Sequence, residues 1–441
     1  MIKNKLLGIP YKIWIWAENN PLKAILIAGI FVRLLVVFLY RHVTLYPDSE
    51  DYIVLAERIL SLNLSGYEGQ RSPGYPLLLA IGNISHIVTC SMQLIAGTVN
   101  LLLFYRLSLS SGLSNKVSLI TTLLLCCYIP AIFFEVAILT ETITLLSITL
   151  IFYLFVRIRI GQSKQYILLS LTCGFLVLIK PFYVFLPLLL FLFSLSGNTS
   201  IKTVFFKSIY IAIVPVIFFL GWSYVNKVNT GHFTSTTFYG FNLAQNCVSF
   251  AENTTPEYAE IGNIYAKYRD NSVSDKEAAM TIWEAYPELE AKTGLSFPGL
   301  SEKLYDYSIA TIRMNPAAYI KQAFVSWRDF WKTSLYWEYD SFAISGANDI
   351  VLYICYAERV LLQLIKILFV LLIPYNIISA IRKRRVEPQV VISIIVFTAS
   401  VLQAMITYGT NSRFSFPFEM LVVLAVILNL RNIRIKNKRF I

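Results

Sequence analysis

Long stretches with almost no charged side chain recur along this chain and constrain its fold more than any other feature. One of them, AILIAGIFVRLLVVFLY at residues 24–40, carries a single charged residue, Arg33. A helix needs about 20 mostly apolar residues to cross the hydrocarbon core of a membrane. Charged residues make up only 15% of the 441 residues, whereas soluble domains carry about 25%. The sequence therefore predicts an all-α polytopic membrane protein.

Apolar runs of about 17–25 residues predict a bundle of about ten membrane-spanning helices. They lie near residues 22–40, 86–106, 117–135, 141–157, 165–180, 182–196, 208–227, 351–373, 389–408 and 414–430. With the N-terminus inside, the inner segments hold 20 lysines and arginines, and the short outer segments hold five. Because cytoplasmic loops carry such an excess, both termini are predicted to be cytoplasmic.

Three regions follow from these spans. Residues 1–228 form an N-terminal transmembrane bundle with an outer loop at 41–85, residues 229–350 form a mostly helical non-cytoplasmic segment, and residues 351–441 form the C-terminal helices. In the outer loop, DSEDYIVLAERILSL predicts an amphipathic helix lying on the membrane. Its apolar face comprises Tyr52, Leu55, Ala56, Ile59 and Leu60.

The sequence contains no pattern typical of a metal site or a disulfide. The six cysteines form no CxxC pair, and the three histidines are scattered. No cofactor is predicted, and a requirement for a divalent metal stays open. No Gly-rich phosphate loop and no internal repeat is present.

Charged residues at membrane depth are costly and commonly mark functional sites. Six of them map to the outer boundary of the predicted bundle: Arg33, Asp48, Arg71, Glu141, Lys180 and Arg413. Each also has a purely structural interpretation. Asp48 is placed to cap the helix that follows, with Asp51 as capping-box partner, and Thr140 is placed to cap the helix that Glu141 begins. The cations suit snorkelling to the interface, and Arg33 must pair, snorkel or face a cavity.

Together these residues favour chemistry on a lipid phosphate. Phosphate is bound by arginine and lysine, and a carboxylate removes a proton from a hydroxyl. A lipid phosphate ester at the outer interface, attacked by an activated hydroxyl, needs both kinds of group.

Seven motifs, in order along nearly the whole chain, resemble the GT-C superfamily of integral-membrane glycosyltransferases. The resemblance is greatest to the branch of protein O-mannosyltransferases and lipid A aminoarabinose transferases. The motifs are PDSEDYIVLAERIL, RSPGYPLLLA, LTETITLLSITLIFYLFVR, GFLVLIKPFYVFLPLLLF, STTFYGFNLAQN, RMNPAAYIKQAFVSWRDFW and SRFSFPFEMLVVLAV. The resemblance implies a membrane enzyme that takes a sugar from a polyprenyl-phosphate donor and inverts its anomeric carbon.

The resemblance also implies roles for residues in the matched motifs. Asp48 corresponds to the general base and Glu141 to a second acid, while Arg71, Lys180 and Arg413 face the donor phosphate. Members often carry an Asp-Glu pair at the first site, but Ser49 follows Asp48 here, so Asp51 competes for the role of base. Tyr52 and Asn242 are predicted to bind substrate.

Two other functions remain open from the sequence. A glycan polymerase or ligase with a diphosphate-linked lipid donor would use similar residues, and a flippase would transport lipid-linked sugars without chemistry. For the transferase, the predicted acceptor is a hydroxyl of a glycolipid, surface glycan or protein, and nucleic acid is not a partner. We expect a bacterial or archaeal cell membrane, with the active site on the non-cytoplasmic side. The sequence does not identify the sugar.

Overall fold

The computed structural model describes residues 2–437 except 163, 197–200, 273, 334–336 and 410, and its described part contains helices but no strand. Its helices comprise α1 (Ile2–Asn19), α2 (Pro21–Tyr40), α3 (Pro47–Leu60), α4 (Gly74–Ile81), α5 (His86–Ser110), α6 (Asn115–Cys126), α7 (Ile129–Glu135), α8 (Glu141–Arg159), α9 (Tyr166–Ile179), η1 (Pro181–Val184), α10 (Phe185–Leu195) and α11 (Ile201–Thr230). They continue with α12 (Tyr239–Gln245), η2 (Val248–Phe250), η3 (Pro256–Tyr258), α13 (Ala259–Asp270), α14 (Asp275–Thr293), α15 (Phe297–Met314), α16 (Pro316–Phe330), η4 (Tyr339–Ser341), α17 (Ala347–Lys383), α18 (Pro388–Ile406), α19 (Asn411–Ser415), η5 (Phe416–Phe418) and α20 (Glu419–Asn437).

All ten predicted spans coincide with helices. In the described part of the chain, seven helices are long and apolar enough to cross a membrane alone. The pair α6 and α7 adds an eighth if it is one span bent by 60°. Pro130 explains this break, because it has no amide hydrogen to donate to the carbonyl of Cys126, the last residue of α6, and its ring clashes with that carbonyl. Helices α9 and α10 are apolar but shorter, and Pro181 separates them. The prediction of an all-α polytopic membrane protein is confirmed.

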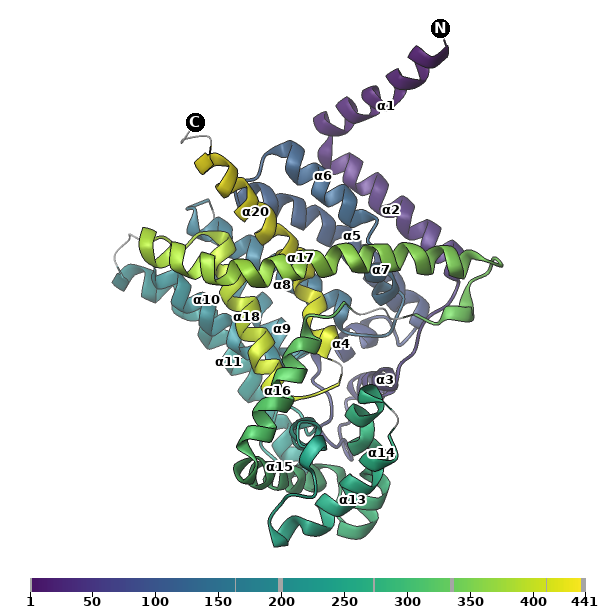
Figure 1. Ribbon diagram of the computed structural model, residues 1–441, viewed down its shortest axis with the longest axis vertical. Helices are drawn as coiled ribbons and strands as arrows, with labels where there is room; N and C mark the ends of the chain where they lie inside the picture. The colour runs from purple at the N-terminus through teal and green to yellow at the C-terminus, as the bar shows by residue number, and fades with distance from the viewer. Residues whose placement is uncertain are drawn as a thin grey trace.

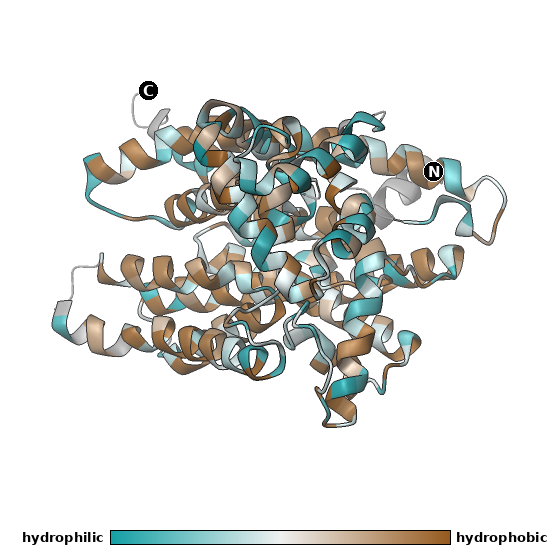
Figure 2. Ribbon diagram, turned by 90° about the horizontal axis from the view of Figure 1, so that it is seen from below, coloured by the Kyte–Doolittle hydropathy of each residue, from teal (hydrophilic) through white to brown (hydrophobic). Residues whose placement is uncertain are grey.

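The helices α12–α15 gather at one end of the molecule, opposite α1 and the end of α20 (Figure 1). Helices α3 and α4 lie between that lobe and the bundle, and α17 crosses the bundle (Figure 1). Seen from below, the peripheral helices are mainly brown, so hydrophobic residues dominate the sides of the bundle (Figure 2). This distribution suits a surface in contact with lipid.

The amphipathic helix predicted within residues 41–85 forms, but its apolar face packs against protein. Tyr52, Leu55 and Ala56 of α3 are buried, and the Tyr52 and Tyr75 ring centroids lie 5.2 Å apart. Only Leu60 of the predicted apolar face is exposed. The prediction that this face lies on the membrane is therefore wrong for these three residues. An apolar stripe fits a protein surface and a lipid surface equally well.

The lobe of α12–α15 has its own hydrophobic core, in which the ring of Phe241 lies 4.7 Å from those of both Trp283 and Phe297. Hydrogen bonds tie the start of the lobe to the loop at residues 41–85. The Thr237 amide donates to the Gly69 carbonyl at 3.0 Å, Thr236 Oγ1 to the Gln70 carbonyl at 2.7 Å, and Ser72 Oγ to the Ser235 carbonyl at 3.2 Å. The loop around Arg71 is thus fixed by a segment more than 160 residues away.

Gly74 allows α4 to approach the end of α9. A Cβ at this position would lie 2.6 Å from both the Ile179 amide nitrogen and the Leu178 carbonyl carbon. We expect Gly74→Ala to push the two helices apart and to lower the free energy of unfolding by about 1–3 kcal/mol. Thermal unfolding in detergent measures the change.

The matched control is Gly221→Ala, since a Cβ at Gly221 of α11 would meet no atom within 4 Å. Alanine at that position is expected to leave stability unchanged or slightly higher, because it favours a helix more than glycine does. Equal unfolding temperatures of the two variants would contradict the tight approach of α4 to α9.

Candidate active site

Six charged side chains from distant parts of the sequence form one connected set of ion pairs, here named the charged cluster. Its members are Asp48, Asp51, Arg71, Glu141, Lys180 and Arg413. It contains three carboxylates and three cations, so its formal charges cancel. Every residue that the sequence assigned to catalysis or to phosphate binding belongs to this cluster.

Arg413 connects the two halves of the charged cluster. Its Nη1 lies 2.8 Å from Asp48 Oδ2, while its Nη2 lies 3.0 Å from Glu141 Oε1 and its Nε donates to the same oxygen at 3.1 Å. Glu141 is completely buried and also accepts from Lys180 Nζ at 3.0 Å. A buried carboxylate requires such partners, because an unpaired charge in the interior is very unfavourable.

Arg71 holds the other end of the charged cluster. Its Nη2 lies 2.8 Å from Asp48 Oδ1 and 2.9 Å from Asp51 Oδ2, and its Nε donates to Asp51 at 3.0 Å. The guanidinium also lies 4.9 Å from the ring centroid of Tyr52 and 4.4 Å from that of Phe238. Aromatic rings on a guanidinium leave its hydrogen-bonding edge free for anions. The predicted substrate-binding residue Tyr52 is thus part of the wall of the cluster.

Backbone contacts align the segment before Asp48 with the segment before Glu141. The amide of Thr44 donates to the Val136 carbonyl at 3.0 Å, and the Ile138 amide donates back to the Thr44 carbonyl at 3.1 Å. Ser49 Oγ donates to the Ile138 carbonyl at 2.8 Å. The two acidic helix starts therefore lie side by side although nearly a hundred residues separate them.

The expected helix caps differ from those observed. Helix α3 begins after Tyr46, and Ser49 Oγ accepts from the Tyr46 amide at 2.9 Å. Asp48 is inside the first turn and is not the N-cap, so that prediction is wrong and its carboxylate is available to the cations. Thr140 does precede α8, but its side chain makes no capping hydrogen bond to the backbone.

Burial and the neighbouring cations act in opposite directions on the two aspartates. Burial raises the pKa of Asp48, but Arg71 and Arg413 outweigh it and hold that pKa below its ordinary range. Burial also raises the pKa of Asp51, and there Arg71 alone does not outweigh it. The pKa of Tyr52 is raised to about 12 by burial, so its hydroxyl stays protonated at neutral pH. Asp48 is therefore the more firmly ionised of the two aspartates.

Asn242 is the one predicted substrate-binding residue that no contact within the described residues joins to the charged cluster. It lies on α12, and its backbone amide donates to the carbonyl of Phe238, the residue that stacks on Arg71. Two aromatic residues at the site were not predicted from the sequence. One is Phe238, which stacks on Arg71. The other is Phe414, whose ring centroid lies 5.2 Å from Lys180 Nζ. Their position next to matched motifs was the only indication that the sequence offered.

A second buried pair lies near the charged cluster. Arg33 contacts Glu135 through Nε at 2.8 Å and Nη2 at 2.5 Å. Arg33 thus pairs inside the protein, which decides among the alternatives left open by the sequence. Glu135 and Glu141 have different partners and belong to separate sets of ion pairs. Within the described residues, no group of three or more histidines, cysteines or acids has the arrangement of a metal site.

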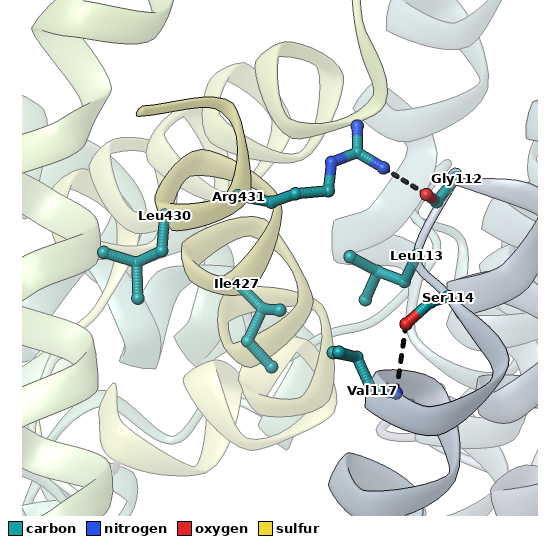
Figure 3. Close-up of a pocket in the computed structure, with 7 residues that line it drawn as sticks. All are labelled: Gly112, Leu113, Ser114, Val117, Ile427, Leu430 and Arg431. Atoms are coloured by element: carbon teal, nitrogen blue, oxygen red, sulfur yellow. Dashed lines mark hydrogen bonds between the residues drawn. The ribbon is translucent and has the colours of Figure 1, made fainter. Parts of the chain in front are cut away.

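An open pocket lies away from this chemistry. Its volume is about 610 Å³, and it is lined by Gly112, Leu113, Ser114, Val117, Ile427, Leu430 and Arg431 (Figure 3). Arg431 lies 12 residues after Glu419 on α20, or about 18 Å along the helix, whereas the charged cluster lies near the beginning of α20. The Arg431 guanidinium donates to the Gly112 carbonyl (Figure 3), so its cation faces backbone.

No family model and no curated protein matches the sequence. Among solved structures, the chain is similar to the oligosaccharyltransferase of Archaeoglobus fulgidus, crystallised with a tethered acceptor peptide, at 10% identity and a TM-score of 0.46. The match covers 92% of this chain and 50% of that one, so this chain spans about half the length of the archaeal enzyme. This similarity is too distant to assign a family, and the functional interpretation depends on the site.

Removal of Arg413 should unbalance the buried charges. We expect Arg413→Gln to lower the free energy of unfolding by about 3 kcal/mol, because it takes away one of the two cations that face buried Glu141. Adding Glu141→Gln should recover part of the loss. Thermal unfolding in detergent measures both changes.

The control is Arg328→Gln on α16, where an exposed arginine lies 3.3 Å from Asp329. Exposed pairs contribute about 0–1 kcal/mol, so this variant should unfold close to the wild-type temperature. A loss as small for Arg413→Gln as for Arg328→Gln would show that the buried bridge does not support the fold.

Proposed function

We propose that the chain is an inverting glycosyltransferase that moves a sugar from a polyprenyl-phosphate donor to an acceptor hydroxyl on the non-cytoplasmic side of the membrane. The charged cluster is the observation that carries this proposal. It offers three cations for a phosphate and three carboxylates, of which two are about one-third exposed in their side chains. The motif resemblance, which covers nearly the whole chain, supports the same assignment.

The cations are needed chiefly for the leaving group, the polyprenyl phosphate. A sugar linked to a polyprenyl phosphate carries one negative charge, and breaking the bond between the anomeric carbon and the phosphate oxygen leaves a phosphate monoester with a charge of about −1.5 to −2. Arg71, Lys180 and Arg413 would stabilise this developing charge. Groups that interact more strongly with the transition state than with the bound donor raise the rate.

Each of these cations is paired with a carboxylate of the protein. Arg413 and Arg71 share Asp48, while Lys180 and Arg413 share Glu141. We propose that a donor phosphate takes some of these cation contacts from the carboxylates. We infer that donor binding is coupled to the pKa of Asp48.

This exchange would prepare Asp48 to act as the base. Arg71 and Arg413 hold the pKa of Asp48 below its ordinary range against the effect of burial, and a carboxylate so stabilised is a poor proton acceptor. When phosphate takes one of these guanidinium groups, burial acts with less opposition and the pKa of Asp48 rises. Asp48 would then become a competent base only after the donor is bound.

In the proposed reaction, the acceptor oxygen bonds to the anomeric carbon on the face opposite the phosphate. The bond from that carbon to the phosphate oxygen breaks, its electron pair leaves with the polyprenyl phosphate, and Asp48 takes the hydroxyl proton. The configuration inverts because attack and departure occur on opposite faces. Asp51 is the rival base, since it shares Arg71 and its pKa is raised by burial.

Replacement of Asp48 separates catalysis from binding. We expect Asp48→Asn to reduce sugar transfer at least about 100-fold, because a general base contributes about 10²–10⁴-fold. The same variant should bind farnesyl phosphate, a soluble mimic of the leaving group, several-fold more tightly. The reason is that the substitution removes the Asp48 carboxylate, which competes with the phosphate for Arg71 and Arg413. Mass spectrometry of surface glycans in complemented cells measures transfer, and calorimetry in detergent measures binding.

Glu50→Gln is the matched control, because Glu50 is an exposed acid in the same helix turn. It should change neither transfer nor binding. Near-normal transfer by Asp48→Asn together with loss in Asp51→Asn would give the role of base to Asp51. Weaker binding of farnesyl phosphate by Asp48→Asn would exclude competition between the carboxylate and the phosphate.

Purified protein separates the transferase from the other two candidate functions. Given mono- and diphosphate-linked sugar lipids, the proposed enzyme should consume only the monophosphate donor, and use of the diphosphate donor would indicate a polymerase or ligase. Acceptor addition should release free polyprenyl phosphate. Transport alone would release none.

A further inference from the structure

Another buried ion pair, Lys366 with Glu419, lies at the turn that follows Arg413. Lys366, near the middle of α17, is 1% exposed, and its Nζ lies 2.8 Å from Glu419 Oε1. The other carboxylate oxygen of Glu419 accepts from the Tyr128 hydroxyl at 2.8 Å. The proposed reaction uses none of these groups. Ionisable side chains within membrane helices are costly and commonly have a functional reason.

The Lys366 ammonium contacts both ends of the turn that follows Arg413. Besides Glu419, the first residue of α20, it donates to Ser415 Oγ at 3.1 Å and to the Lys332 carbonyl at 2.9 Å. Ser415 is the last residue of α19 and lies two residues after Arg413. These three contacts of the ammonium join α17, the chain after α16 and the turn between α19 and α20.

The other end of α19 is held in a similar way. Asn411 Nδ2 donates to the Gln403 side chain at 2.9 Å, to the Ser326 carbonyl at 3.1 Å and to the Thr407 carbonyl at 3.2 Å. Arg413 is therefore the middle residue of a five-residue helix that is fixed at both ends. Helix α19 is too short to hold its own conformation, because isolated helices below about 12 residues are marginal.

Stability alone does not explain why this position carries charges. Replacing a buried ion pair by apolar groups of similar volume is often neutral or stabilising, because desolvation offsets the attraction of the charges. An apolar pair would fill the space between α17 and α20 but would offer no directed hydrogen bonds to Ser415 and to the Lys332 carbonyl. The directed contacts are what the charged pair adds.

We propose that Lys366 is a positioning residue, which fixes α19 so that the Arg413 guanidinium stays directed at the phosphate site. This inference rests on the proposed function, in which Arg413 binds the donor phosphate. Lys366 acts only through Arg413 and touches neither donor nor acceptor. Its loss should therefore reproduce the loss of Arg413 and should add little to it.

A double-mutant cycle on the full chain in detergent tests this coupling. The variant Lys366→Met with Glu419→Gln removes the pair without leaving a buried unpaired charge. We expect it to raise the Kd for farnesyl phosphate about tenfold, which is typical of losing a hydrogen bond to a charged group. Arg413→Met should raise the Kd as much or more. Combining all three substitutions should leave the Kd within about twofold of Arg413→Met, whereas independent effects would multiply.

The KM for the donor and the kcat of steady-state transfer distinguish a positioning role from a merely structural one. The Lys366 and Glu419 variant should divide its effect between donor KM and kcat in the same proportion as Arg413→Met. Loss of folded protein alone would lower kcat and leave KM unchanged. Asn376→Leu is the matched control, since Asn376 is equally buried on α17 but donates to Ser393 of α18 at 2.9 Å. It should leave the Kd unchanged.

Ser415→Ala keeps the ion pair and tests the same contact if the first variant does not fold. It should raise the Kd about two- to threefold, and only when Arg413 is present. An unchanged Kd, or losses that multiply with Arg413→Met, would overturn the positioning role and leave the proposed function intact. Failure of the wild-type protein to bind farnesyl phosphate would overturn both.

Discussion

The guanidinium of Arg413 bridges two carboxylates, and the arrangement of the rest of the site depends on this bridge. It joins Asp48 at the start of α3 to Glu141 at the start of α8, and it comes from the short helix α19 before the last helix. Glu141 is fully buried, and a buried carboxylate persists only with cations at hydrogen-bonding distance. The need to neutralise this one charge therefore brings three distant segments of the chain together.

The balance of charges in the cluster connects the fold to the proposed chemistry. Three carboxylates and three cations pair with one another in the cluster. Under the proposed function, a donor phosphate competes with these carboxylates for the cations, and this competition would weaken donor binding but would activate Asp48 as the base. Asp48 and Asp51 differ accordingly. Burial raises the pKa of both carboxyl groups, but two guanidinium groups outweigh it for Asp48, whereas for Asp51 burial, with the nearby Asp48 and Glu50 carboxylates, outweighs Arg71.

Two buried ion pairs and one aromatic ring hold the helices that carry the cluster. Arg33 and Glu135 tie α2 to α7, and Lys366 and Glu419 tie α17 to α20, both pairs being buried. The lobe of α12–α15 contributes Phe238, which stacks on Arg71. The packing of polar pairs within an apolar bundle is expected where backbone segments must be held in irregular turns, because lipid offers no hydrogen bonds to such turns.

The sequence by itself determined the all-α membrane architecture, since every predicted span is helical, and it selected the six residues of the charged cluster as candidates. Both inferences depend on the cost of charge in hydrocarbon, which acts locally and is visible in any single segment. The sequence did not determine which carboxylate pairs with which cation. It also did not show that Ser49, and not Asp48, completes the first turn of α3, or that the apolar face of α3 packs on α4. Phe238, Phe414 and the support from Lys366 were equally invisible. Only the tertiary structure decided these points, because ion pairs and stacking require residues hundreds of positions apart to reach distances of a few ångströms, and an apolar stripe does not state what will cover it.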